Sequence, residues 1–246
     1  TAAKHLNENN VDALIVVGGN GSFKGAEHLQ NFWDKPIIGI PATIDNDIAG
    51  TDFTIGFHTA IQTAVESIDK VRDTAEAFER IFLVEVMGRE AGFIALDSAI
   101  SSGSDHVLVP ELFTSAAEEL VKILDKLDIR RKNKANSSHI IIVTENLWPG
   151  GLNILADSLV SETGFDVRVL TLGHVQRGGS PVSKDRMLAT RLGTYAVESI
   201  LKGETGVMVG ETHTKPVLVD LATTRTTTKN LNRYSVDILE KITRLG

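Results

Sequence analysis

The chain is organised around residues 36–52, which read PIIGIPATIDNDIAGTD. Residues 36–40 form a short apolar run typical of a buried strand, so the carboxylates of Asp45 and Asp47 follow the end of a strand. In an open α/β sheet, ligands bind at this edge. Because Asn, Asp and Gly also favour turns, a polar turn without a ligand is the alternative interpretation.

Short apolar runs alternate with helical patterns along the chain. The pattern predicts strands at 12–17, 36–40, 80–87, 105–109, 139–144, 166–172 and 206–210, and helices at 22–31, 57–75, 90–102, 114–128, 150–163, 184–202 and 230–245. This alternation indicates an α/β fold with mainly parallel sheets and helices on both faces. The basic stretch 130–138 is expected to be a solvated connection, with effector binding as the alternative.

The composition excludes several classes of function. The 246 residues are 42% hydrophobic and 23% charged, as in a soluble globular protein. A net charge of −7 argues against non-specific binding to nucleic acid. The chain has no cysteine, which fits a reducing cytoplasm, and no apolar run approaches the roughly 18 residues of a membrane span. We therefore expect a cytoplasmic protein that binds neither nucleic acid nor membrane.

Three further loops place glycines and charged side chains after predicted strands. Residues 18–22, GGNGS, open a helix, where glycine lets backbone amides approach a phosphate; a tight turn is the alternative. Arg89 lies at the start of a predicted helix, where the helix dipole disfavours a cation. An anionic ligand therefore explains Arg89 better than a purely structural role does. Residues 173–181, GHVQRGGSP, add His174 and Arg177 and fit an anion site.

Taken together, these motifs resemble the phosphofructokinases. The motifs are GGNGS at 18–22, PATIDND at 41–47, GTDFTIGF at 50–57, VEVMGR at 84–89 and LGHVQRGGSP at 172–181, in the order and spacing of the bacterial type of 6-phosphofructokinase. The resemblance covers essentially the whole chain. Because that family has a further N-terminal segment with a first glycine-rich nucleotide loop, this chain is expected to lack that segment.

The resemblance also implies a domain organisation. We expect two Rossmann-like three-layer α/β domains with mainly parallel sheets and an active site in the cleft between them. Residues 1–56 and 178–246 would form the nucleotide-binding domain, and residues 57–177 the sugar-phosphate-binding domain.

The family's reaction transfers a phosphoryl group from ATP, with Mg²⁺, to the 1-hydroxyl of fructose 6-phosphate. The product is fructose 1,6-bisphosphate, and the reaction is the committed step of glycolysis. The resemblance implies that Asp45 is the general base, that Asp47 is the acid near metal and substrate, and that Thr43 steadies the transferred group, with Arg89 as a further catalytic residue.

The binding residues follow from the same resemblance. The substrate pocket would be formed by Thr43, Asp45, Met87, Gly88, Arg89, Glu145, His174 and Arg177, with Arg80 and Arg168 reaching into a neighbouring subunit's site of a homotetramer. The ATP phosphate loop would contain Asn20, Gly21, Ser22 and Gly25. Arg72 and Asp105 match an allosteric site for ADP or phosphoenolpyruvate, with Asp105 in place of a Glu.

Small residues near the phosphate loop bear on the phosphate donor. Pyrophosphate-dependent relatives carry Asp where this chain has Gly21 and Lys where it has Ala42, so the small residues here leave room for a nucleotide and favour ATP. Ala42 replaces a usual Gly, and we expect that change to have little effect.

Asn20 is the more serious departure, because it replaces an Asp that helps hold Mg²⁺ in the family. Asn20 and Asp47 are the expected metal ligands; either the lost charge lowers activity, or Asp45 and Asp47 hold the metal.

Two hypotheses therefore remain open from the sequence. One is a competent ATP-dependent kinase. The other is a weakly active or inactive paralogue that acts as a regulatory or sugar-phosphate-binding subunit. A lipid or NAD kinase is disfavoured because it would not explain the motifs after residue 80.

Overall fold

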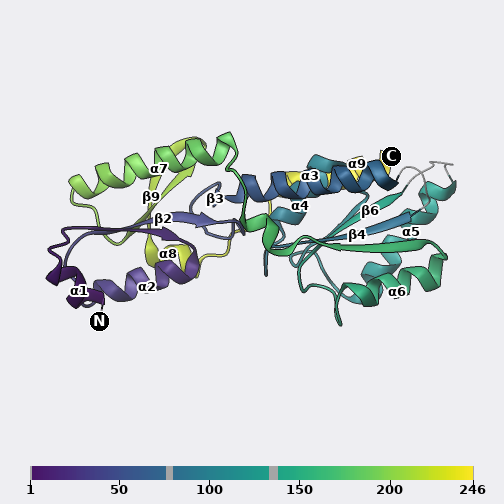
Figure 1. Cartoon of the computed structure of the whole chain (residues 1–246), viewed down its shortest axis with the longest axis horizontal. Coiled ribbons are helices and arrows are strands. Elements are labelled where there is room, and N and C mark those ends of the chain that lie inside the picture. The colour runs from purple at the N-terminus through teal and green to yellow at the C-terminus, as the bar shows by residue number, and fades with distance from the viewer. Residues whose placement is uncertain (1, 76–79, 133–137, 246) are drawn as a thin grey trace. The chain divides into compact units, whose positions relative to one another are not determined.

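The computed structural model describes residues 2–75, 80–132 and 138–245, which divide into two compact units. Unit 1 comprises Thr1–His58 and Pro181–Asn230, and unit 2 comprises Thr59–Ser180 and Leu231–Gly246. In each unit, helices cover both faces of a mainly parallel sheet (Figure 1). The predicted fold class is confirmed.

Unit 1 contains the sheet β1-β2-β8-β9, with β3 paired to the end of β2. The strands are β1 (Leu14–Gly18), β2 (Ile37–Thr43), β3 (Ile55–Gly56), β8 (Val207–Thr212) and β9 (Lys215–Asp220). Helices α1 (Ala2–Glu8), α2 (Asn20–Gln30) and α8 (Leu221–Thr226) cover one face, and α7 (Ser183–Leu201) covers the other (Figure 1). The two faces of β2 are both buried, because Ile37 belongs to the core with Phe23, and Ile38 belongs to the core with Leu188. This explains the continuous apolar run before the Asp45 loop.

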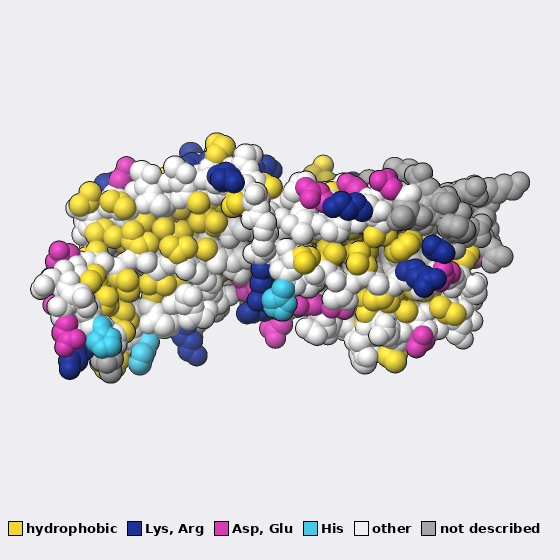
Figure 2. All heavy atoms as spheres, in the orientation of Figure 1, with side chains coloured by type: hydrophobic (Ala, Val, Ile, Leu, Met, Phe, Trp, Pro, Cys, Tyr) yellow, Lys and Arg dark blue, Asp and Glu magenta, His cyan; other side chains and the backbone are white. Residues whose placement is uncertain are grey.

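One edge of the unit 1 sheet is formed by β1, which has β2 as its strand partner in the described part of the chain. Val17 is 60% exposed there. Figure 2 shows hydrophobic side chains along this face, between α7 and α2.

Unit 2 contains the parallel sheet β5-β6-β4-β7. The strands are β4 (Arg80–Val86), β5 (His106–Leu108), β6 (His139–Thr144) and β7 (Asp166–Thr171). Helices α5 (Ala116–Lys132) and α6 (Leu152–Thr163) cover one face, and α3 (Phe57–Ala75), α4 (Phe93–Ser102) and α9 (Arg233–Leu245) cover the other (Figure 1). Ile81 and Leu83 of β4 pack in one core with Ile123 of α5 and Leu155 of α6. The strand ends of this sheet place the loops described below.

Several predicted boundaries differ from the structure. Residues 231–246, expected in the nucleotide-binding domain, belong to unit 2, because α9 packs on α4. The sequence did not predict β3, β9 or α8. Helix α5 runs to Lys132, into the stretch expected to be a loop. Residues 133–137 of that predicted connection lie outside the described residues. Among the described helices, none combines the length and the hydrophobicity needed to cross a membrane.

Candidate active site

The Asp45 loop begins where β2 ends, at Thr43. Asp45 is only 8% exposed, and its backbone N–H donates to Thr43 Oγ1 at 3.3 Å. The Thr54 hydroxyl donates to the Thr43 carbonyl at 2.6 Å, so the loop folds back onto the strand that it leaves. A polar turn that served solvation alone would not bury a carboxylate in this way.

The far end of this loop is anchored to β8 and to the turn that follows it. Asp52 N–H donates to the Glu211 carbonyl at 2.8 Å, and Asp52 Oδ2 accepts from the His213 backbone N–H at 2.6 Å. The Glu211 carboxylate is itself held by Arg191, at 2.5 and 2.8 Å. Both ends of the loop are therefore tied to the sheet, which limits its freedom.

Asn20 and Asp47 meet at the start of α2. Asn20 Nδ2 donates to Asp47 Oδ2 at 2.8 Å. Asn20 Oδ1 is buried and has no hydrogen-bond partner in the described structure. A buried polar atom without a partner destabilises the fold unless a ligand or an ion binds to it. An amide oxygen beside a carboxylate is the donor chemistry that Mg²⁺ prefers, so these two residues fit the expected ion. Within the described residues, no cluster of three or more His, Cys, Asp and Glu side chains forms a separate metal site.

The glycine-rich loop leads directly into α2, which begins two residues earlier than predicted, at Asn20. The first backbone amides of a helix have no partner within it and attract anions. A Cβ atom at Gly18 would collide with Ser22 Oγ, whereas a Cβ at Gly21 or Gly25 would meet nothing within 4 Å. Gly18 is thus required by packing, and Gly21 and Gly25 leave open space beside the helix start.

In unit 2, the loops after β4, β6 and β7 meet at one edge of the sheet, because these strands are neighbours. Glu145 Oε1 accepts from the backbone N–H groups of Gly88 and Arg89, at 3.1 and 3.0 Å. The Met87 backbone N–H donates to Gln176 Oε1 at 2.8 Å. The structure therefore brings together Met87, Gly88, Arg89 and Glu145. It adds Gln176, a buried residue that the sequence did not single out.

His174 and Arg177 lie in the short 3-10 helix Gly173–Arg177 that follows β7, on either side of Gln176. Both side chains are exposed, whereas Gln176 is buried. Gln176 thus ties the loop of His174 and Arg177 to the loop of Met87. A nearby carboxyl also belongs to this region: burial, and secondly Glu145, raise the pKa of Glu85.

Arg80 and Arg168 lie elsewhere in unit 2. Arg80 is the first residue of β4, so it lies at the opposite end of the strand from Met87. Both arginines engage one carboxylate: Arg80 Nε lies 2.8 Å from Asp166 Oδ2, and Arg168 Nη2 lies 3.1 Å from the same atom. Asp166 was not predicted, although its position two residues before Arg168 on one strand face would have indicated the pair.

The two predicted allosteric residues both have bonds within unit 2. Arg72, in the last turn of α3, donates to the Ser102 carbonyl at the end of α4. Asp105 Oδ2 accepts from the Ile140 backbone N–H at 2.6 Å. Both residues therefore lie close to the amino ends of β5 and β6, away from the Met87 loop.

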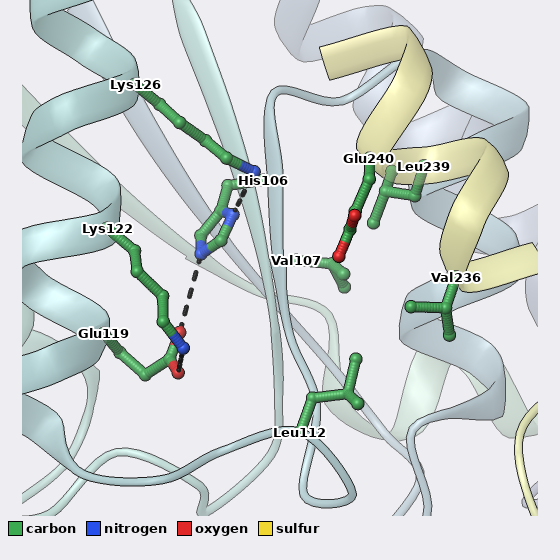
Figure 3. A pocket seen from close by; sticks show the side chains of 9 residues that line it. All are labelled: His106, Val107, Leu112, Glu119, Lys122, Lys126, Val236, Leu239 and Glu240. Carbon is green, nitrogen blue, oxygen red and sulfur yellow. Dashed lines mark hydrogen bonds and ion pairs between the residues drawn. The ribbon is translucent and has the colours of Figure 1, made fainter. Parts of the chain in front are cut away.

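A cavity of about 350 Å³ lies along β5, between α5 and α9 (Figure 3). Lys126 Nζ lies 2.9 Å from His106 Nδ1, and His106 Nε2 lies 3.8 Å from Glu119 Oε2. Burial lowers the pKa of His106, while His106 and then Lys122 bring the pKa of Glu119 down to about 2. The polar groups of α5 and β5 thus interact with one another, and no site residue predicted from the sequence lines this cavity.

Comparison with known proteins gives a consistent result. The phosphofructokinase family model matches residues 1–200. The chain is 44% identical over 223 residues to ATP-dependent 6-phosphofructokinase 1 of Thermus thermophilus, covering 91% of this chain and 68% of that protein. It is 41% identical over 245 residues to ATP-dependent 6-phosphofructokinase 2 of Bacteroides thetaiotaomicron, covering 98% of this chain and 73% of that protein.

A solved structure agrees with these matches. The crystal structure of Pichia pastoris phosphofructokinase in the T-state has a TM-score of 0.84 and 31% identity, and the match covers 98% of this chain but 29% of that one. The fold and the paired loops define an α/β protein with polar sites at the carboxyl ends of its strands. The chain belongs to the phosphofructokinase family.

Proposed function

We propose that this protein transfers the γ-phosphoryl group of ATP to the 1-hydroxyl of fructose 6-phosphate, giving fructose 1,6-bisphosphate. The observation that carries the proposal is the loop from Thr43 to Asp47, where the buried Asp45 lies two residues from an Asp47 that is held by Asn20. Curated relatives named ATP-dependent 6-phosphofructokinase favour this reaction over a paralogue without activity.

Asp45 acts as the general base in this proposal. It takes the proton from the 1-hydroxyl as that oxygen attacks the γ-phosphorus, and the bond to the leaving ADP oxygen breaks. Thr43, which accepts the Asp45 N–H, fixes the base and steadies the transferred group. Arg89 neutralises charge on the phosphates.

Asn20 and Asp47 would hold Mg²⁺, and the buried, unpartnered Asn20 Oδ1 supports this assignment. When bound, the ion would supply neutralisation of charge on the phosphates. Asn20 would offer one uncharged amide oxygen next to the Asp47 carboxylate, which is the residue that its side chain contacts. The metal site is therefore weaker than one made by two carboxylates.

ATP is the proposed phosphate donor. Its phosphates would lie on the amides at the start of α2, with the Ser22 hydroxyl and the glycines of this loop beside them. The open space beside Gly21 and Gly25 supports a nucleotide, because an Asp at position 21 would fill that space with negative charge.

Fructose 6-phosphate would bind to the unit 2 loops. Glu145 orients the backbone of Gly88 and Arg89, and His174 and Arg177 face solvent where they can reach an anion. Arg80 lies at the other end of the sheet and Arg168 contacts the same carboxylate, Asp166, which supports a role for both in the site of a neighbouring subunit in a homotetramer. Arg72 and Asp105 are the proposed contacts for ADP or phosphoenolpyruvate as effectors.

The test is turnover of the full-length protein with ATP, Mg²⁺ and fructose 6-phosphate in a coupled assay, for the wild type and Asp45→Ser. General base catalysis contributes roughly 10²- to 10⁴-fold, so we expect kcat to fall by that factor while fructose 6-phosphate affinity is retained. Asp34→Ser, at an exposed position of unit 1, is the matched control. A wild type without turnover would contradict the proposed function, and an active Asp45→Ser would contradict the base assignment.

A further inference from the structure

Asn46, between the two acidic residues of the loop, has an unusual backbone conformation and a side chain that forms hydrogen bonds through both its oxygen and its nitrogen. Its φ is 54°, in the left-handed region, and the residue is only 3% exposed. Asn46 Oδ1 accepts from the Thr54 backbone N–H at 3.1 Å, and Asn46 Nδ2 donates to the Asp52 carbonyl at 3.5 Å. A non-glycine residue keeps such a conformation only where its surroundings enforce it.

Lys229 is the residue from outside the loop that completes this arrangement. Its half-buried side chain donates from Nζ to Asn46 Oδ1 at 2.8 Å and to the Asp52 carbonyl at 2.8 Å. It thus bridges the first and last parts of the loop. It also brings a positive charge to a segment that carries Asp45, Asp47 and Asp52.

We propose that Lys229 is a positioning residue for phosphoryl transfer, which holds Asn46 in its left-handed conformation and thereby fixes the directions of Asp45 and Asp47. This inference rests on the proposed function, because Asp45 must be the base for its direction to matter. Successive side chains depart from a backbone in directions set by its φ and ψ angles, so a change at Asn46 turns its two neighbours relative to each other. Misplacement by about 1 Å can lower a rate by about 10²-fold.

A purely structural role for Lys229 predicts that its removal lowers Tm together with kcat, whereas a positioning role predicts a fall in kcat alone. Without Lys229, Asn46 Oδ1 still accepts from Thr54 and the Asp52 carbonyl still accepts from Asn46, so neither group loses all its partners. Removing Lys229 should therefore loosen the loop without unfolding unit 1. The effect should appear in kcat rather than in substrate affinity, because Lys229 contacts the loop through Asn46 and Asp52.

The test compares Lys229→Met with Lys229→Arg, and uses Lys202→Met, at an exposed position of unit 1, as the matched control. We expect kcat of Lys229→Met to fall roughly 10- to 100-fold, with KM for fructose 6-phosphate within about twofold and an unchanged Tm. Lys229→Arg, which can still donate to two oxygens, should recover at least a third of the wild-type kcat. The Lys202→Met control should match the wild type in all three quantities.

A second measurement separates this inference from the proposed function. Hydrogen exchange of the amides of residues 43–54 should accelerate in Lys229→Met and not in Lys202→Met, whether or not the protein turns over fructose 6-phosphate. Unchanged exchange there, or a kcat within twofold of wild type, would overturn the role of Lys229. A fall in kcat that is matched by a fall in Tm would also overturn it, in favour of a structural tie. If the wild type lacks turnover but exchange still accelerates in Lys229→Met, the proposed function alone is refuted.

Discussion

Replacing Asn20 by Asp tests the site at its most unusual residue. Asn20 Nδ2 donates to Asp47 Oδ2 at 2.8 Å, so Asn20→Asp replaces a hydrogen bond to a charged group with two facing carboxylates. The lost bond is worth about 1.5–3 kcal/mol. Two like charges relaxed to about 4 Å repel by about 4 kcal/mol at an effective dielectric constant of 20, and screening at the half-exposed Asp47 reduces this to about 1 kcal/mol.

Without a divalent cation, Asn20→Asp should therefore be about 2–4 kcal/mol less stable than the wild type. A cation bound between the carboxylates reverses the effect, and saturation at 100 times Kd returns about 2.7 kcal/mol. At about 2–4 °C per kcal/mol for a protein of this size, Mg²⁺ should raise the Tm of the variant by about 5–10 °C. The wild type, with one carboxylate fewer, should respond less, and the variant should turn over faster with Mg²⁺ present.

The assay is thermal unfolding in EDTA and in a MgCl₂ series, followed by turnover at the same Mg²⁺ concentrations. Asn31→Asp is the matched control, because it makes the same charge change at an exposed position near the end of α2. If Asn20→Asp is as stable as the wild type in EDTA, or gains no more from Mg²⁺ than Asn31→Asp does, the reasoning about this pair is refuted.

Three further outcomes follow from the geometry. Gly88→Ala should lower the free energy of unfolding by about 1–3 kcal/mol in urea titrations, because Gly88 has a φ of 146° and its added Cβ would lie 2.5 Å from the Ala91 carbonyl oxygen; an unchanged midpoint would contradict this. The free energy of unfolding should decrease as the pH drops below about 6.5, because burial lowers the pKa of His106 and the unfolded chain therefore binds more protons than the folded one. His106→Gln should flatten this dependence on pH. Gly21→Asp should raise KM for ATP about tenfold through repulsion of the phosphates while leaving Tm unchanged, since its Cβ meets nothing within 4 Å; a lower Tm would show that the space is not open.

The layered α/β fold was predictable because buried strands appear as short continuous apolar runs and helices as amphipathic patterns. The β8–β9 hairpin was not. Its two-residue turn, His213 and Thr214, has φ values of 51° and 62°, which ordinarily call for Asn-Gly or a similar pair. Asp52 Oδ2 accepts the His213 N–H and thus supports the turn from far away in sequence. A local pattern cannot reveal a turn that a distant residue stabilises.

The candidate site divides in the same way. The loops with Asp45, Arg89 and His174 were visible because polar residues and glycines follow apolar runs. The residues that hold these loops in place were not visible. Gln176 lies inside a motif that drew attention to His174 and Arg177, Lys229 lies outside every motif, and their roles come from partners 89 and 183 positions away.

The placement of Arg80 at the start of β4 and of Arg89 beyond its end has a consequence for mixtures of variants. The six steps from Arg80 to Val86 span about 20 Å, at about 3.3 Å per residue, and Arg89 follows that end of the strand, so the two arginines lie too far apart to bind one small sugar phosphate together. If Arg80 contributes to the site of a neighbouring subunit, a subunit with a substituted Arg89 can still provide its Arg80 to a subunit whose own Arg80 is substituted. Two variants that are each inactive should then regain part of their activity when their subunits are exchanged. Such complementation would show that the active site contains residues from two subunits, without any structure of the assembly.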